Sequence, residues 1–230
     1  MAKKINYKKI IPIVVMAMTF VFIFYFIQKN RLLLFKDLKE NIRYLVFIAL
    51  AYIMGRIFEG LRLKIMANVF SLNLKRWEWI GLSFVVPYYN LMLPKGGTIA
   101  NAAYFNIKHK FAFEKFVAFT SGGLLLTFLV NGFFGIMAVS ICIISDGKIS
   151  NLWFLSLFIP MFIGAAILMC IPRIKLFDNH RLLSKINSIL DGWKKLRSDR
   201  TVLFRLIVVQ IAILSSFALR YYFAFKIFTS

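Results

Sequence analysis

Polar and small residues interrupt an apolar stretch at residues 84–116, which has the sequence FVVPYYNLMLPKGGTIANAAYFNIKHKFAFEKF. Pro94 blocks a continuing helix because it has no backbone donor, while Gly96 and Gly97 permit positive φ and close approach of another group. Lys95 adds a positive charge at the same point. Lipid cannot satisfy a freed backbone, so a helix broken at membrane depth must be buried in protein or line a polar cavity. Transporters build substrate sites from such breaks, and the pattern therefore predicts a site for an anionic group such as phosphate or diphosphate.

Aromatic and amide side chains flank this break and offer hydrogen bonds to a polar headgroup. They are Tyr88, Asn90, Asn101 and Tyr104. A lysine at the middle of a membrane helix costs about 2.5–3.5 kcal/mol on insertion scales, so Lys95 is a functional candidate in its own right. The alternative is that residues 94–97 form an ordinary surface loop between two full spans, with Lys95 in water.

A second group of charges lies in the apolar segment that precedes the break. Arg56, Glu59 and Arg62 are spaced i, i+3 and i+6, so on a helix Glu59 can pair with either arginine. On the functional interpretation these side chains contact a headgroup. The alternative is that the arginines extend toward the inner headgroups without binding a specific ligand.

Composition indicates a membrane protein with a single domain over residues 1–230. The chain is 60% hydrophobic, whereas soluble domains have about 45–50% apolar residues. A net charge of +21 would suggest nucleic acid on a soluble protein. Here the basic residues lie between apolar segments, where they face anionic headgroups. We therefore expect anionic membrane lipids as partners and no nucleic acid.

The apolar segments predict an all-α, polytopic bundle, since about 20 residues cross a hydrocarbon core of about 30 Å. Five spans are predicted, at residues 10–27, 44–60, 117–144, 152–171 and 202–228. Residues 77–107 are predicted to dip into the membrane and return as a re-entrant helix pair, because basic residues bracket them on both sides. Residues 179–198 are predicted to form an amphipathic helix on the inner leaflet. The basic N-terminus is predicted to be cytoplasmic.

Enzyme, metal and cofactor motifs are not found in the sequence. It has no Gly-rich phosphate loop, HExxH, acid pair or nucleophile elbow. Cys142 and Cys170 lack metal-ligand spacing and are expected to pack. We expect no catalytic residue, no metal and no cofactor. A membrane-embedded transferase acting on a lipid headgroup is the enzyme-class alternative, with Glu59 and Glu114 as its nearby acids.

Two segments resemble the transmembrane region of the lysylphosphatidylglycerol synthase/flippase family. They are FKDLKENIRYLVFIALAYIMGRIFEGLRLKIMANVFSLNLKRWEWI and YYNLMLPKGGTIANAAYFNIKHKFAFEKF, and the resemblance covers roughly residues 35–131. Around the break, Asn90, Pro94, Gly96 and Gly97 fit the family pattern. Thr98 and Asn101 stand where an acidic residue and an arginine are common in the family.

The resemblance implies a flippase-like protein of the bacterial inner membrane, short or truncated, without the aminoacyl-transferase domain of some members. The main hypothesis is that it binds or translocates an anionic lipid or a lipid-linked saccharide. The alternatives are a small-solute permease, the transferase named above, and a helper subunit with no substrate of its own. A homo-oligomer or a partner in envelope biosynthesis is compatible with each of them.

Overall fold

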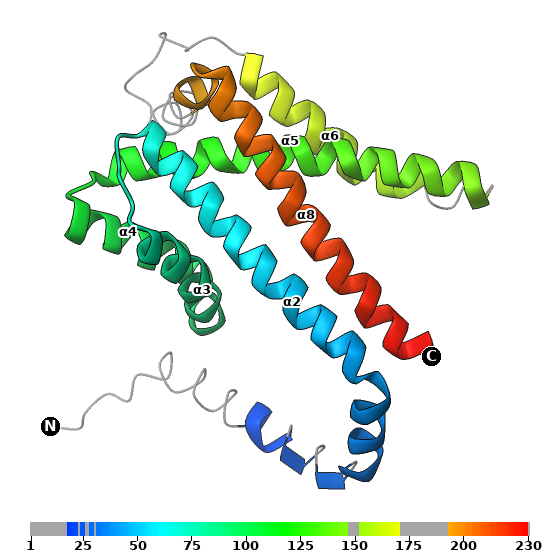
Figure 1. Cartoon of the computed structure of the whole chain (residues 1–230). Helices are drawn as coiled ribbons and strands as arrows, with labels where there is room; N and C mark the ends of the chain where they lie inside the picture. Colours follow the sequence, from blue (N-terminus) through cyan, green and yellow to red (C-terminus); the bar gives the residue numbers. More distant parts are fainter. Residues whose placement is uncertain are drawn as a thin grey trace, which may run out of the picture. The chain divides into compact units, whose positions relative to one another are not determined.

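The computed structural model describes residues 18–22, 24–25, 28–29, 31–146, 152–170 and 193–229 (Figure 1). All regular secondary structure in these ranges is helical, which confirms the predicted all-α class. The helices in chain order are α2 Arg31–Val69, α3 Arg76–Met92, α4 Gly96–His109, α5 Phe113–Asp146, α6 Leu152–Cys170 and α8 Arg200–Thr229.

Three of these helices are long and apolar enough to cross a membrane. The candidate spans are Asn41–Val69 in α2, Lys115–Ser145 in α5 and Arg200–Ile227 in α8. Only 11% to 28% of the most apolar window of each span is buried within the protein, so most of this apolar surface faces outward. A surface of this kind supports a membrane location, because isolated soluble domains rarely expose such large apolar patches.

The structure supports the five predicted spans only in part. Three lie within helices of sufficient length, and each helix extends beyond the predicted bounds: 44–60, 117–144 and 202–228. The predicted span at 152–171 is a shorter apolar helix, with its apolar part at Leu152–Leu168. The predicted span at 10–27 lies mostly outside the described residues, as do residues 179–192 of the predicted amphipathic helix.

The chain divides into two compact units. Residues 1–49 and 221–230 form one, and residues 50–220 form the other. In the first, the Phe47 ring stacks on that of Phe223 with centroids 4.9 Å apart. The second unit contains the helices that line the site described below.

An aromatic cluster in the second unit joins the end of α4 to the start of α5. Phe105 is fully buried, and its ring lies 5.8 Å from those of Phe116 and Phe119, both in edge-on geometry. Phe111, between the two helices, contacts the same ring at 6.2 Å. Edge-on aromatic pairs contribute about 0.5–1.5 kcal/mol each beyond the area they bury. The cluster therefore fixes where α4 ends against α5.

Helices α2 and α3 cross closely at Gly60. A Cβ atom placed there would lie 2.6 Å from the Trp79 ring and 2.8 Å from the Trp79 carbonyl oxygen. A larger residue would push the helices apart, since the carbonyl oxygen belongs to the α3 backbone. The crossing brings Glu59 and Arg62 of α2 toward α3.

Candidate functional site

The interrupted segment folds as a helical hairpin of α3 and α4, with a turn at residues 93–95. The Leu93 N–H donates to the Tyr89 carbonyl oxygen at 3.0 Å, and the Gly96 N–H donates to the Leu93 carbonyl oxygen at 2.8 Å. Lys95 adopts the left-handed conformation, with φ of 64°, immediately before α4 begins. The helix pair predicted at 77–107 is present, with helix bounds of 76–92 and 96–109.

Asn90 and Gly97 lock the tip of this hairpin. The Gly97 N–H donates to Asn90 Oδ1 at 2.8 Å. A Cβ atom on Gly97 would lie 2.5 Å from the Val86 carbonyl oxygen, so only glycine fits without a shift of the backbone. The N–H groups of Gly96 and Gly97 are thus engaged inside the hairpin. Their predicted role as donors to a headgroup would require these bonds to open.

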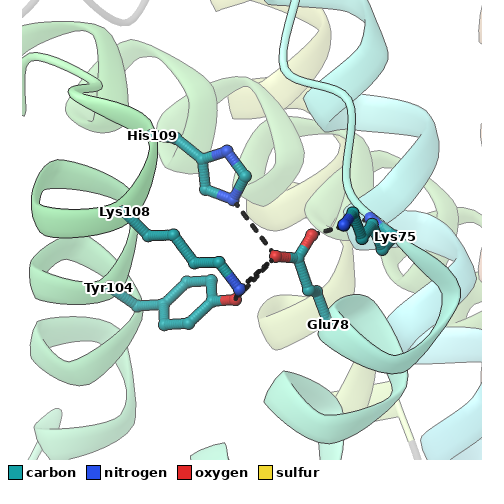
Figure 2. Close-up of polar contacts among 5 residues, drawn as sticks. All are labelled: Lys75, Glu78, Tyr104, Lys108 and His109. Carbon is teal, nitrogen blue, oxygen red and sulfur yellow. Dashed lines mark hydrogen bonds and ion pairs between the residues drawn. The ribbon is translucent and has the colours of Figure 1, made fainter.

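Glu78 closes the other end of the hairpin (Figure 2). Its Oε1 lies 2.6 Å from Lys108 Nζ and accepts a hydrogen bond of 3.0 Å from the Tyr104 hydroxyl. His109 Nε2 lies 3.7 Å from the same oxygen, and the Lys75 N–H donates to Oε2 at 2.7 Å. The hydrogen bond from Lys108 is the main cause that lowers the pKa of Glu78 to about 2. The two ends of the hairpin are therefore held together by one ionised carboxylate.

A cavity of about 310 Å³ lies between this hairpin and helices α2 and α5. Part of its wall is apolar, and part carries polar side chains from all four helices. The polar ones are Glu59, Arg62, Ser83, Thr98, Asn101, Thr120 and Thr127. Ligand pockets span about 300–1,000 Å³, so the cavity can hold a headgroup or a small solute but not a whole lipid.

Arg62 supplies the positive charge of the cavity wall. Its Nη1 donates to Gln210 Oε1 at 2.7 Å and to Thr127 Oγ1 at 3.1 Å. Gln210 Nε2 in turn donates to Asn131 Oδ1 at 3.4 Å. No carboxylate lies within salt-bridge distance of Arg62 among the side chains that the structure describes. The hydrogen-bond partners of Arg62 are therefore neutral, and Glu59, three residues earlier on α2, is the acidic side chain that shares the cavity wall with it.

Two buried oxygens of the cavity residues have no hydrogen-bond partner within the described part of the chain. They are Asn101 Oδ1 on α4 and Thr120 Oγ1 on α5. A buried polar atom without a partner costs about 1–3 kcal/mol, so each one requires an explanation. A polar ligand that enters the cavity would supply the missing bonds, since both side chains line it.

Arg56 and Glu59 form an ion pair beside the cavity. Arg56 Nη1 lies 2.8 Å from Glu59 Oε2, while the Arg56 guanidinium lies 5.3 Å from the centroid of the Tyr52 ring. Of the two arginines that could pair with Glu59, the structure selects Arg56. Glu59 lines the cavity, whereas Arg56 does not.

The structure divides the predicted site residues into three places. Asn101, Glu59 and Arg62 line the cavity, with Arg56 paired beside them. Lys95, Pro94, Tyr88 and Asn90 lie at the hairpin tip with exposed side chains, next to the buried Gly96 and Gly97. Tyr104 lies at the closed end, bonded to Glu78. The hairpin thus lines the cavity with residues of its two helices, whereas residues 93–97 at its tip do not line it.

Most hydroxyl groups of the cavity, and the Gln210 amide that holds Arg62, were not predicted from the sequence. Ser83, Thr98, Thr120 and Thr127 are common residues in apolar helices, and nothing local distinguishes them. Gln210 could have been predicted as an interhelical contact, because a lone amide inside an apolar span needs a polar partner.

Comparison with family models finds no match to this chain, and neither the curated proteins nor the solved structures contain one.

Proposed function

We propose that this protein binds the headgroup of an anionic lipid in the cavity between α2, α3, α4 and α5, and that it belongs with the flippase-like membrane proteins. The observation that carries the proposal is Arg62, a cation held by neutral partners at the wall of a cavity inside an apolar helix bundle. A positive charge in such surroundings is costly unless anions compensate it. Glu59 shares the cavity wall but is already ion-paired with Arg56, so two arginines face one carboxylate. A phosphate group would compensate the second arginine.

The other cavity groups favour a headgroup that carries hydroxyls as well as phosphate. The Arg62 guanidinium can donate further hydrogen bonds to phosphate oxygens, whereas Asn101 Oδ1 can only accept. A glycerol or sugar hydroxyl would satisfy that acceptor. Phosphatidylglycerol and lipid-linked saccharides combine both kinds of group.

The proposal also includes the cellular setting implied by the family resemblance. The chain would lie in a bacterial inner membrane with its N-terminus in the cytoplasm, and the hairpin of α3 and α4 would enter the bilayer from that side. Three helices of spanning length support a membrane location. Binding alone needs no catalytic group, and we propose no reaction. Translocation of the bound lipid is the further step that this hypothesis expects.

Binding of fluorescent short-chain phosphatidylglycerol to the purified protein in phosphatidylcholine nanodiscs tests the proposal. Asn101→Leu should lower the affinity about five-fold, because one hydrogen bond contributes about 1 kcal/mol. The matched control is Asn73→Leu, which makes the same change at an exposed position between α2 and α3. Parent-like affinity in both variants would place the headgroup outside this cavity.

A further inference from the structure

A second cavity adjoins the first one. It occupies about 220 Å³ between α4 and α5, and its lining is largely apolar. Ile99 and Ala102 of α4 and Val117 of α5 contribute to its wall, together with Phe113 at the start of α5. We refer to it as the α4–α5 groove.

The groove and the polar cavity share one wall. Thr98, Phe116 and Thr120 line both of them, so no other element separates the two spaces. One space is lined by Arg62, Glu59 and amide and hydroxyl groups, and the other by aliphatic and aromatic side chains. This pairing of adjacent polar and apolar compartments matches an amphipathic molecule. A small soluble solute would need the polar compartment alone.

The outer side of the groove faces the surroundings of the protein. Ile99 is 63% exposed and Phe113 is 66% exposed. The groove lies where the spanning part of α5 begins, at Lys115, which is also exposed. The end of a span is the depth at which headgroups meet acyl chains, and a lysine there attracts anionic lipids. An acyl chain can therefore reach the groove directly from the bilayer.

Thr120 occupies the boundary between the two spaces. Its hydroxyl is buried and has no hydrogen-bond partner in the described ranges, although its side chain lines both compartments. In a lipid, the ester oxygens lie at the corresponding boundary between the polar headgroup and the apolar chain. An ester carbonyl at this place would accept a hydrogen bond from Thr120.

We propose that the α4–α5 groove is the lateral entrance of the site and holds one acyl chain of the lipid whose headgroup lies in the polar cavity. This inference rests on the proposed function and specifies its substrate class: a diacyl lipid that enters sideways from the bilayer, with its ester region at Thr120. The volumes agree with this division, because about 310 Å³ accommodates a headgroup, while the groove of about 220 Å³ takes the part of the chain next to the ester.

The experiment compares two probes on the same protein. One is fluorescent phosphatidylglycerol in phosphatidylcholine nanodiscs, and the other is sn-glycerol 3-phosphate, which offers the headgroup without chains. Ala102 lines the groove and not the polar cavity, so Ala102→Phe adds bulk to the groove wall. Ala103→Phe is the matched control, since Ala103 is exposed on the same helix and lines neither space. We expect Ala102→Phe to weaken lipid binding at least ten-fold and to change glycerol phosphate binding less than two-fold, with no change in the control.

Other results would overturn the inference in distinguishable ways. Unchanged lipid binding in Ala102→Phe would show that the groove holds no chain. Equal weakening for both probes would place the effect in the polar cavity. A parent protein that binds glycerol phosphate as tightly as the lipid would favour a small-solute permease. Absence of binding for both probes in the parent would remove the proposed function itself, and this inference with it.

A second measurement needs no variant and therefore avoids any folding defect. Phosphatidylglycerol with a diazirine in one acyl chain is photolysed in nanodiscs with the unmodified protein, and the labelled peptides are identified by mass spectrometry. We expect labelling within residues 99–120 that excess unlabelled phosphatidylglycerol removes. Labelling that competition does not reduce, or that lies elsewhere, would contradict the proposed entrance.

Discussion

Arg62 of α2 donates a hydrogen bond of 2.7 Å to the side-chain oxygen of Gln210 in α8, a residue that is only 2% exposed. The same guanidinium group reaches Thr127 of α5 at 3.1 Å, so one side chain connects three helices. Gln210, its partner on α8, is buried, and Arg62 and Thr127 both line the cavity. The connection therefore holds Arg62 in one place at the cavity wall.

Removal of the Gln210 side-chain amide should destabilise the protein. Gln210→Leu removes the 2.7 Å hydrogen bond of Arg62 and leaves the one to Thr127, and a buried polar group without its bond costs about 1–3 kcal/mol. Unfolding in mixed micelles with increasing SDS measures the change. Ser215→Leu, at an exposed position on the same helix, is the control and should stay close to the parent. Equal unfolding curves for the two variants would refute the structural role of Gln210.

Two glycines of the α3–α4 hairpin should respond oppositely to alanine. A Cβ atom at Gly97 would meet the Val86 carbonyl oxygen at 2.5 Å, and overpacking of this kind costs about 1–3 kcal/mol. Gly81 on α3 has nothing within 4 Å of its Cβ position, so Gly81→Ala should be neutral or stabilising by up to about 1 kcal/mol. Thermal unfolding in detergent compares them. Stability in Gly97→Ala equal to that in Gly81→Ala would contradict the packing at the tip.

Acid should loosen the hairpin through Glu78. Its pKa in the folded protein is lowered from 4.5 to about 2, chiefly by the hydrogen bond from Lys108. A carboxyl with a lowered pKa stabilises the fold above its unfolded pKa, and this contribution disappears as the pH falls toward about 2. Between pH 5 and pH 2, the parent should lose more stability than Glu78→Gln. Salt should reduce the difference, because Lys108 is exposed. Parallel losses in the two proteins at low salt would argue against this ion pair.

The sequence was sufficient to predict the helices and the break between α3 and α4, because both depend on local chemistry. Pro94 together with Gly96 and Gly97 favours a break, although Pro87 and Pro160 lie inside continuous helices. Runs of apolar residues identify α2, α5 and α8. The cavity could not be predicted in this way. Its wall joins Arg62, Asn101 and Thr120 from three helices, and their meeting depends on helix crossings such as the one at Gly60.

The predicted site residues also show that the sequence does not reveal which helices meet. Lys95 follows from the break itself, and the structure indeed places it at the turn, but with an exposed side chain. Asn101 was predicted from its nearness to the break in sequence. It reaches the cavity because α4 runs back along α3 and carries it away from the tip. The position of Asn101 in the sequence thus identified it as a site residue, but it did not show that the site is the cavity and not the hairpin tip.

Lys95 should affect lipid binding differently from the cavity residues. An exposed lysine attracts anionic lipid by about 1 kcal/mol, and salt screens that attraction. Lys95→Gln should therefore weaken binding of phosphatidylglycerol several-fold at low ionic strength and little at high ionic strength. The Asn101→Leu defect should persist at both, because it reflects a hydrogen bond inside the cavity. A Lys95→Gln defect that salt leaves unchanged would indicate that Lys95 contacts the bound headgroup directly.

The ends of the α3–α4 hairpin should lie on one side of the membrane. Glu78 near the start of α3 lies 2.6 Å from Lys108 near the end of α4, so the flanking positions Asn73 and Lys110 emerge together. Single cysteines at these two positions, in a protein with Cys142 and Cys170 replaced by alanine, can be tested in intact cells with a membrane-impermeant maleimide. We expect neither to react until the membrane is permeabilised, since the basic flanks favour the cytoplasm. Reaction of both in intact cells would reverse the orientation but keep the hairpin. Reaction of one alone would place the two flanks on opposite sides of the membrane, and the hairpin arrangement would then be ruled out.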